Sequence, residues 1–228
     1  VAIEGERTLA ASCIREPAEG MIVTTDQPRE TQARKMVMEM LVTDQPTQNL
    51  AHDKSSHLWD MAAQQDVSDS RFPKLDTDFV PLLDSSHVAM SVNLDACIQC
   101  GLCVRACREV QVNDVIGMAG RGANAYPVFD MDDPMGDSSC VACGECVQAC
   151  PTGALMPATV TDENQVGDSA DFDSEVDSVC PFCGVGCQIS LKVKNGKVKF
   201  VEGINGPANE GRLCVKGRFG FDYIHHDH

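Results

Sequence analysis

The sequence predicts an α+β protein, and three observations point to this class. A cysteine-rich run occurs twice between residues 97 and 151. Apolar residues recur at helical spacing through residues 29–43, and two alternating segments flank the pair Asn195-Gly196. The first pattern is typical of tight loops and short helices around a bound group, the second of an amphipathic helix, and the third of a β-hairpin.

Both copies of the cysteine-rich run have the spacing C-x2-C-x2-C-x3-C. Three thiolates on so tight a loop can each reach a different iron of one cubane cluster, whereas the fourth begins the following helix and points away. Closed by Pro151 in its second copy, this spacing is the iron–sulfur run of bacterial ferredoxins, whose fourth cysteine ligates the other cluster. We therefore expect one [4Fe–4S] cluster on Cys97, Cys100, Cys103 and Cys150, and a second on Cys140, Cys143, Cys146 and Cys107.

A third cysteine group lies near the end of the sequence, with the spacing C-x2-C-x3-C-x26-C. Its members are Cys180, Cys183, Cys187 and Cys214. A zinc ribbon is the alternative here, but the spacing does not form two paired knuckles. The glycine-rich loop CPFCGVGC can instead turn backbone N–H groups toward cluster sulfurs, so we predict a third [4Fe–4S] cluster.

Zinc and disulfides are the alternatives for the duplicated run. Eight close-set cysteines exceed what one zinc ion uses, and disulfides suit small secreted domains. Of the 13 cysteines, only Cys13 stands outside the three groups. Cluster thiolates need a reducing compartment, so we expect a cytoplasmic protein. The net charge of −16 argues against nucleic acid as a partner, and no apolar run is long enough for a membrane span.

Several secondary-structure elements follow from the patterns. The helix over residues 29–43 should pack through Ala33, Met36, Val37, Met40 and Leu41. A second helix should follow Ser55 or Ser56, with Leu58, Met61 and Ala62 inward and Asp60 outward. Residues 67–90 are polar and interrupted by proline, which favours an extended linker over the surface. A two-stranded excursion is expected around residues 115–119 and 126–129.

The end of the sequence combines an acidic segment with a basic hairpin. Residues 161–178 carry seven acidic side chains and no basic one, which predicts a hydrated connector. A two-residue turn at Asn195-Gly196 would pair Val193 with Val198, Leu191 with Phe200, Lys194 with Lys197, and Lys192 with Lys199. Stacked lysines indicate either an anionic neighbour or an edge strand open to water, and we favour the edge strand.

Two stretches of sequence resemble known families. VCPFCGVGCQISLKV and GRLCVKGRFGFDYIHHDH resemble the opening segment of the molybdopterin oxidoreductase superfamily, and in particular formate dehydrogenase catalytic subunits. The resemblance implies a cluster beside a molybdenum or tungsten bis-pterin guanine dinucleotide cofactor. It also implies that Lys216, two residues after the last cysteine, links the two. The metal-ligating catalytic residues of that family lie downstream, and nothing here matches them.

The first residues carry a separate resemblance. LAASCIREPAEGMIV resembles the end of a plant-type [2Fe–2S] domain, which implies that Cys13 is the fourth ligand of a cluster completed by upstream residues. Related subunits of respiratory NADH dehydrogenase then carry H-x3-C-x2-C-x5-C, the ligands of another cluster. This sequence keeps His52 and His57 but has no cysteine between Cys13 and Cys97, so we interpret the two histidines as surface residues.

The order of these segments resembles the alpha subunit of cytosolic, NAD-dependent formate dehydrogenases. The implied fold is a ferredoxin-like double [4Fe–4S] domain with flanking helices, then a small β-hairpin [4Fe–4S] domain that opens a molybdopterin oxidoreductase fold. The segments are 1–30 ([2Fe–2S] tail), 31–90 (helices and linker), 91–158 (double cluster), 159–178 (acidic linker) and 179–228 (third cluster).

The resemblance also implies a function and partners. Electrons from formate would pass from a downstream bis-pterin domain of the same polypeptide, through the clusters, to a flavin- and NAD-binding iron–sulfur partner subunit. The segment itself would hold electron-transfer centres and no catalytic residue. Alternatives are the iron–sulfur subunit of a respiratory NADH dehydrogenase, a hydrogenase diaphorase subunit, a stand-alone polyferredoxin-like carrier and, remotely, a structural zinc module.

Overall fold

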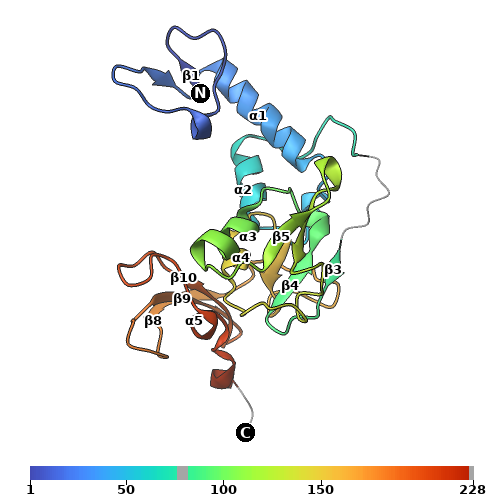
Figure 1. Cartoon of the computed structure of the whole chain (residues 1–228), viewed down its shortest axis with the longest axis vertical. Coiled ribbons are helices and arrows are strands. Elements are labelled where there is room, and N and C mark those ends of the chain that lie inside the picture. Colours follow the sequence, from blue (N-terminus) through green and yellow to red (C-terminus); the bar gives the residue numbers. More distant parts are fainter. Residues whose placement is uncertain (76–81, 226–228) are drawn as a thin grey trace. The chain divides into compact units, whose positions relative to one another are not determined.

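The structure is a computed structural model that describes residues 1–75 and 82–225 (Figure 1). Its contacts divide the chain into two compact units. The first consists of Val1–Asp44 and Asp60–Asp76, and the second of Gln45–Trp59 and Thr77–His228. The second unit contains the three cysteine groups, whereas Cys13 belongs to the first.

The first unit opens with a small antiparallel pair of strands, β1 (Ala2–Ile3) and β2 (Val23–Thr24). Helix α1 (Pro28–Val42) follows, with Pro28 in its first turn, where the missing N–H costs no hydrogen bond. The helix predicted over residues 29–43 is therefore confirmed within one residue at each end. Helix α2 (His57–Gln64) is also at the expected place.

The prediction of which α1 face is buried was wrong. The buried side chains are Glu30, Met38 and Val42. Three of the residues assigned to the core are exposed: Met36, Val37 and Met40. Apolar residues occur on more than one face of this helix, so spacing alone could not select the packed face. In α2, Leu58 and Ala62 are buried as expected and Asp60 is exposed, but Met61 is exposed and Trp59 is buried.

Residues 83–157 of the second unit, which include the duplicated cysteine run and are called the double-cysteine region below, contain two small sheets. Strands β3 (Leu83–Asp84), β4 (Met90–Asn93) and β7 (Leu155–Pro157) form an antiparallel sheet in the order β3-β4-β7. Strands β5 (Ile116–Ala119) and β6 (Tyr126–Phe129) form the predicted excursion. The fully buried Met90 and Val92 of β4 pack in one core with buried Phe129 and Met135. The linker expected over 67–90 thus contains β3, and its residues 76–81 lie outside the described residues.

Two short helices carry cysteines of the duplicated run. Helix α3 (Leu102–Arg105) continues into a π-helical turn at Ala106–Val110, and α4 (Glu145–Ala149) is its counterpart in the second copy. The expectation that the fourth cysteine begins a helix was wrong. The helices start before the third cysteine, so Cys107 lies in the π-helical turn and Cys150 caps the end of α4.

The last part of the second unit is a three-stranded antiparallel sheet with a short helix, all visible together in Figure 1. Its strands are β8 (Ser174–Val179), β9 (Gln188–Lys194) and β10 (Lys197–Gly203), in the order β10-β9-β8, and α5 (Val215–Phe219) follows. In the segment 161–178, predicted as a hydrated connector, β8 forms in the second half and pairs with β9, although all of its residues are exposed.

The hairpin register agrees with the prediction only near the turn. Lys194 pairs with Lys197 and Val193 with Val198, but a shift after Val198 then places Phe200 opposite Lys192 and Val201 opposite Leu191. The predicted pairs Leu191–Phe200 and Lys192–Lys199 were therefore wrong. Phe200 and Val201 are successive residues of β10, and both are buried because they belong to different cores: Phe200 packs with Met156 and Val160, and Val201 with Ile189 and Leu213.

Three lysines of this hairpin, Lys192, Lys194 and Lys199, contact carboxylates of the same chain. Lys192 is buried, with its Nζ 2.7 Å from Glu175 and 3.4 Å from Glu202. Lys194 and Lys199 both contact Asp171. The expectation of a lysine-protected edge was wrong for β9, which is the central strand, but β10, which carries Lys197 and Lys199, does lie at an edge of this sheet. The anionic neighbour is the acidic segment itself.

Candidate iron–sulfur sites

The first candidate site is a cavity in the second unit next to α3. Its lining includes Cys97, Cys100, Cys103 and Cys150, so the structure brings together the four cysteines predicted for one cluster. The loop before α3 winds tightly because Gln99 and Gly101 have positive φ angles of 58° and 71°. The Gln99 N–H donates to the Cys97 Sγ at 3.4 Å. Such N–H donors favour a charged sulfur.

The second candidate site repeats this geometry. Its cavity is lined by Cys107, Cys140, Cys143 and Cys146 together with apolar neighbours such as Val115 and Ile116. Ala142 and Gly144 have φ angles of 56° and 71°, matching the pair in the first copy. The N–H groups of Ala142 and Val115 donate to the Sγ atoms of Cys140 and Cys107 at 3.4 and 3.3 Å. The duplication seen in sequence is therefore also a duplication of loop conformation.

The chemistry of both cavities suits a positively charged group. Burial raises the pKa of the Cys103 thiol to about 12, and the neighbouring Cys150, Cys97 and Cys100 contribute to this rise. Burial likewise raises the pKa of Cys146 far above its usual value. Four thiolates in one such cavity would repel each other, and iron ions supply the compensating charge. The residues thus fit an iron–sulfur cluster.

A single zinc ion fits the described residues less well. Among them, no three His, Cys, Asp or Glu side chains are close enough to hold one metal ion. Zinc draws its sulfur ligands to about 2.3 Å, whereas each cysteine of a cubane binds a different iron and the sulfurs stay further apart. Each of the two cavities is lined by four cysteines, the number of ligands that one cubane takes.

The third cysteine group lies at one end of the β8-β9-β10 sheet. Cys180 follows β8, is buried and packs with Ile189, Val201 and Leu213. Its N–H donates to the carbonyl of Cys187 at 2.8 Å, which closes the CPFCGVGC loop. Burial and then the thiols of Cys180, Cys183 and Cys214 raise the pKa of Cys187, so the four sulfurs are neighbours. Cys183 and Cys214 are exposed, unlike any cysteine of the second cavity.

The remaining predicted residues are exposed, with one exception. Lys216 lies in α5 close to Cys214, and Cys13 lies in a 3-10 turn at Ser12–Ile14 of the first unit. His57 is exposed, but the prediction of a surface residue was wrong for His52. Its ring is mostly buried, with Nδ1 2.8 Å from the Asn93 amide and Nε2 3.4 Å from Asp95.

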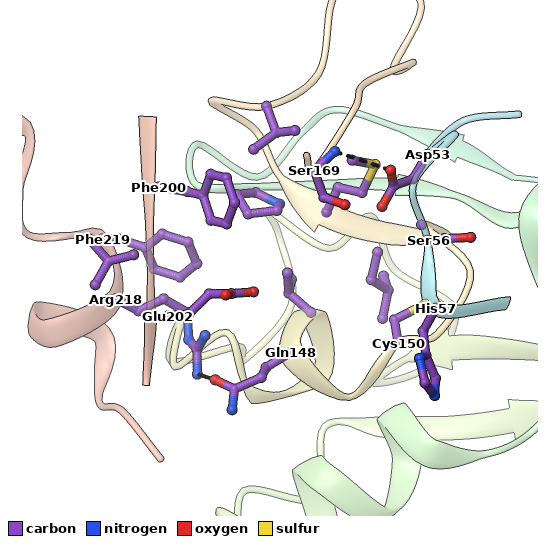
Figure 2. Close-up of a pocket in the computed structure, with 17 residues that line it drawn as sticks. Asp53, Ser56, His57, Gln148, Cys150, Ser169, Phe200, Glu202, Arg218 and Phe219 are labelled. Carbon is purple, nitrogen blue, oxygen red and sulfur yellow. Dashed lines mark hydrogen bonds between the residues drawn. The ribbon is translucent and has the colours of Figure 1, made fainter. Parts of the chain in front are cut away.

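Sequence reasoning missed a cavity of about 220 Å³ between the double-cysteine region and α5. Figure 2 shows Arg218 and Phe219 of α5 on one side, and Gln148 and Cys150 on the other. The sequence offers no signal for this cavity, because the burial of Arg218, four residues after the last cysteine, is seen only in the structure.

Two family descriptions match parts of the chain. "4Fe-4S dicluster domain" matches residues 96–154, and "Molybdopterin oxidoreductase Fe4S4 domain" matches residues 173–226. The first covers both cavities, and the second covers the third cysteine group and α5. No helix in the described part of the chain has the length and apolar character of a membrane span.

Relatives match over most of the chain. A protein of Rhizobium meliloti, named as a subunit of NADH-quinone oxidoreductase, is 34% identical over 98% of this chain and 26% of its own length. A Staphylococcus haemolyticus protein named "Putative formate dehydrogenase SH0748" is 32% identical over 58% of this chain and 17% of its own length. The chain thus spans about a quarter or less of these two curated relatives.

A solved structure shares the fold. The NAD+-reducing [NiFe]-hydrogenase in its H2-reduced state matches with a TM-score of 0.61 and 24% identity, over 68% of this chain and 67% of the other. The mixed α+β fold, with its double-cluster and Fe4S4 domains, agrees with the predicted fold class. The chain therefore combines a 4Fe-4S dicluster domain with a molybdopterin oxidoreductase-type Fe4S4 domain, and it is similar over nearly its whole length to a subunit of an NADH-quinone oxidoreductase.

Proposed function

We propose that this chain is the electron-transfer portion of a formate dehydrogenase alpha-type subunit. Electrons from formate, released at a molybdenum or tungsten bis-pterin site of the same polypeptide, would leave through a flavin- and NAD-binding partner subunit. The observation that carries the proposal is the succession of a double-cluster domain and a molybdopterin-type Fe4S4 domain within one compact unit.

The proposed ligands are the cysteines that share a cavity or a loop. One [4Fe–4S] cluster is held by Cys97, Cys100, Cys103 and Cys150, a second by Cys107, Cys140, Cys143 and Cys146, and a third by Cys180, Cys183, Cys187 and Cys214. Such clusters accept and release single electrons. The chain's own residues supply the thiolates, the N–H donors to sulfur and the apolar walls that exclude water.

Two further residues complete the proposal. Lys216 would lie between the third cluster and the pterin cofactor, in line with its exposed position next to Cys214. Cys13 would be the fourth ligand of a [2Fe–2S] cluster whose other ligands come from upstream residues. Its exposed turn leaves the thiol accessible for that role.

A second candidate is the iron–sulfur subunit of an NADH-quinone oxidoreductase. The 34% identity to one such subunit over nearly the whole chain favours it. The absence of any cysteine between Cys13 and Cys97 favours the formate dehydrogenase instead, because the additional cluster of the respiratory subunits needs ligands in that interval. The histidines in this interval are His52, which is hydrogen-bonded to Asn93, the exposed His57, and His87 near the end of the interval.

The deciding experiment uses the full-length protein with its partner subunits. Formate-dependent reduction of NAD, with molybdenum or tungsten bound, supports the first candidate. NADH-dependent quinone reduction without formate activity supports the second. In either case, the purified protein should contain iron and inorganic sulfide and show paramagnetic signals when reduced. Zinc in their place would refute both candidates.

A further inference from the structure

One arginine connects two cysteine groups that lie far apart in the sequence. Arg218 belongs to α5, and its backbone N–H donates to the carbonyl of Cys214 at 3.1 Å. Its side chain points to the double-cysteine region, where Nε donates to the carbonyl of Cys143 at 3.0 Å. A single residue thus joins the backbone of the third cysteine group to that of the second cavity.

The rest of the guanidinium is held from the same side. Nη2 donates to Gln148 Oε1 at 2.7 Å, as drawn in Figure 2, and lies 3.5 Å from Glu145 Oε2. The side chains of Arg218 and Glu145 are only 4% and 2% exposed. Gln148 in turn donates to the carbonyl of Gly211 at 2.8 Å, and Arg212 also contacts Glu145. The contact is therefore a buried network anchored in α4.

Gly144 sets how closely α5 approaches. A Cβ atom at this position would collide with Cδ of Arg218 and lie 2.8 Å from Cζ of Phe219. Its equivalent in the first copy, Gly101, has nothing within 4 Å. Both glycines have the same positive φ of 71°, so the loop conformation favours glycine in each copy. Of the two, only the glycine of the second copy also contacts α5.

The position of the charge has an electrostatic consequence. Arginine remains protonated in proteins, so Arg218 places a buried positive charge beside the second cavity. A positive charge stabilises a neighbouring group that gains an electron, and the effect is stronger where water is excluded. The Arg218 side chain donates to the carbonyl of Cys143, which lines the second cavity. Among the described residues, it donates to no cysteine of the first cavity.

We propose that Arg218 is a positioning residue that selects the Cys107–Cys140–Cys143–Cys146 site as the electron-exchange neighbour of the third cysteine group. It joins the Cys143 and Cys214 loops through one hydrogen-bonded path and raises the reduction potential of the Cys143 site. A single electron passes between the two sites, one being oxidised as the other is reduced, with no bond broken and no proton moved. The inference rests on the cluster assignments proposed above.

The test compares three variants of the cluster-loaded full chain: Arg218→Met, Arg218→Lys and the control Arg212→Met. Arg212 also contacts Glu145 but its side chain is half-exposed. Iron content is measured first, and the midpoint potentials are then obtained by redox titration monitored by electron paramagnetic resonance. Magnetic broadening between the reduced second and third clusters reports whether the two loops keep their contact.

Arg218→Met should keep its iron. It should lower the midpoint potential of the second cluster by a tenfold change in the reduction equilibrium, which is about 59 mV for one electron. It should also weaken the magnetic broadening between the second and third clusters. Arg218→Lys keeps the charge and should restore the midpoint, whereas Arg212→Met should shift it less than Arg218→Met.

Three unchanged midpoints in an iron-replete Arg218→Met would overturn the inference, and so would an equal shift in Arg212→Met. If Arg218→Met loses iron, the iron-replete Arg218→Lys decides the question. A second-cluster midpoint equal to that of the wild type supports the inference, and a shifted one overturns it. A wild type without three [4Fe–4S] signals would overturn the cluster assignments themselves, and with them this inference.

Discussion

The double-cysteine region and the third cysteine group use different means to arrange four thiols. In the double-cysteine region, Cys107 and Cys146 belong to the same core as Met90 and Phe129, so the candidate ligands are part of the packing. In the third group, only Cys180 is buried, and the loop that follows it is exposed. A site inside a core couples ligation to folding more strongly than a site on a loop at the end of a sheet.

The largest expected effect comes from exchanging one cysteine in each region. Cys146→Ser and Cys183→Ser should each remove one of three clusters and about one third of the [4Fe–4S] iron. Cys146→Ser should lower the free energy of unfolding more than Cys183→Ser, by about 3 kcal/mol, because it removes a buried sulfur as well as the cluster that fills the cavity. Iron analysis and chemical denaturation measure the two effects. Equal losses of stability would contradict the comparison between the regions.

The second effect concerns the two equivalent glycines. Gly101→Ala should cost about 1 kcal/mol of stability, because alanine is strained at a positive φ but has open space there. Gly144→Ala should cost about 3 kcal/mol, since its Cβ would also collide with Arg218. Thermal unfolding of the two variants, side by side, measures the difference. Identical midpoints would mean that α5 can move away without loss.

A third effect is a difference in acid sensitivity. Burial raises the pKa of Asp84, but hydrogen bonds from Ser86 and from the Met135 N–H outweigh it, so the pKa lies below 3.8. The stabilisation is therefore present above pH 3.8 and is lost as the pH falls through the lower folded value. Asp84→Asn should destabilise the protein by about 1–2 kcal/mol at neutral pH. Denaturation at several pH values should show the gap to the wild type closing in acid, and a constant gap would contradict this.

The smallest effect is expected in the β8-β9-β10 sheet. The Glu175 carboxylate accepts hydrogen bonds from Lys192 and from Ser190, and these two bonds, in that order, lower its pKa. The Glu175 side chain is half-exposed. Lys192→Met should raise that pKa toward 4.5 but change stability by less than about 1 kcal/mol, because solvent screens the pair. Nuclear magnetic resonance titration of the Glu175 carboxyl checks the first effect, with Lys197→Met as the control. An unchanged Glu175 pKa in Lys192→Met would disprove the pairing.

The features predicted well from sequence are those encoded by local patterns. The three cysteine groups, the α1 helix, the β5–β6 excursion and the turn at Asn195-Gly196 all follow from spacing or from turn residues. The failures depend on contacts distant in sequence. Whether Met40 or Met38 is buried depends on what packs against α1, and in the acidic segment β8 pairs with β9, where Glu175 contacts Lys192. The contacts of Arg218 are made to Cys143 and Glu145, which are about 75 residues away in the sequence.

The exchange of fourth cysteines between the two cavities has a consequence for modularity. Cys107 lines the cavity of the second copy and Cys150 that of the first, so neither copy contains a complete set on its own. Cutting the gene between the copies would therefore yield two halves that are each one sulfur short. With the ligands proposed above, the repeat could be duplicated or transplanted only as a pair, and oxidation of Cys107 or Cys150 would impair the site in the other copy.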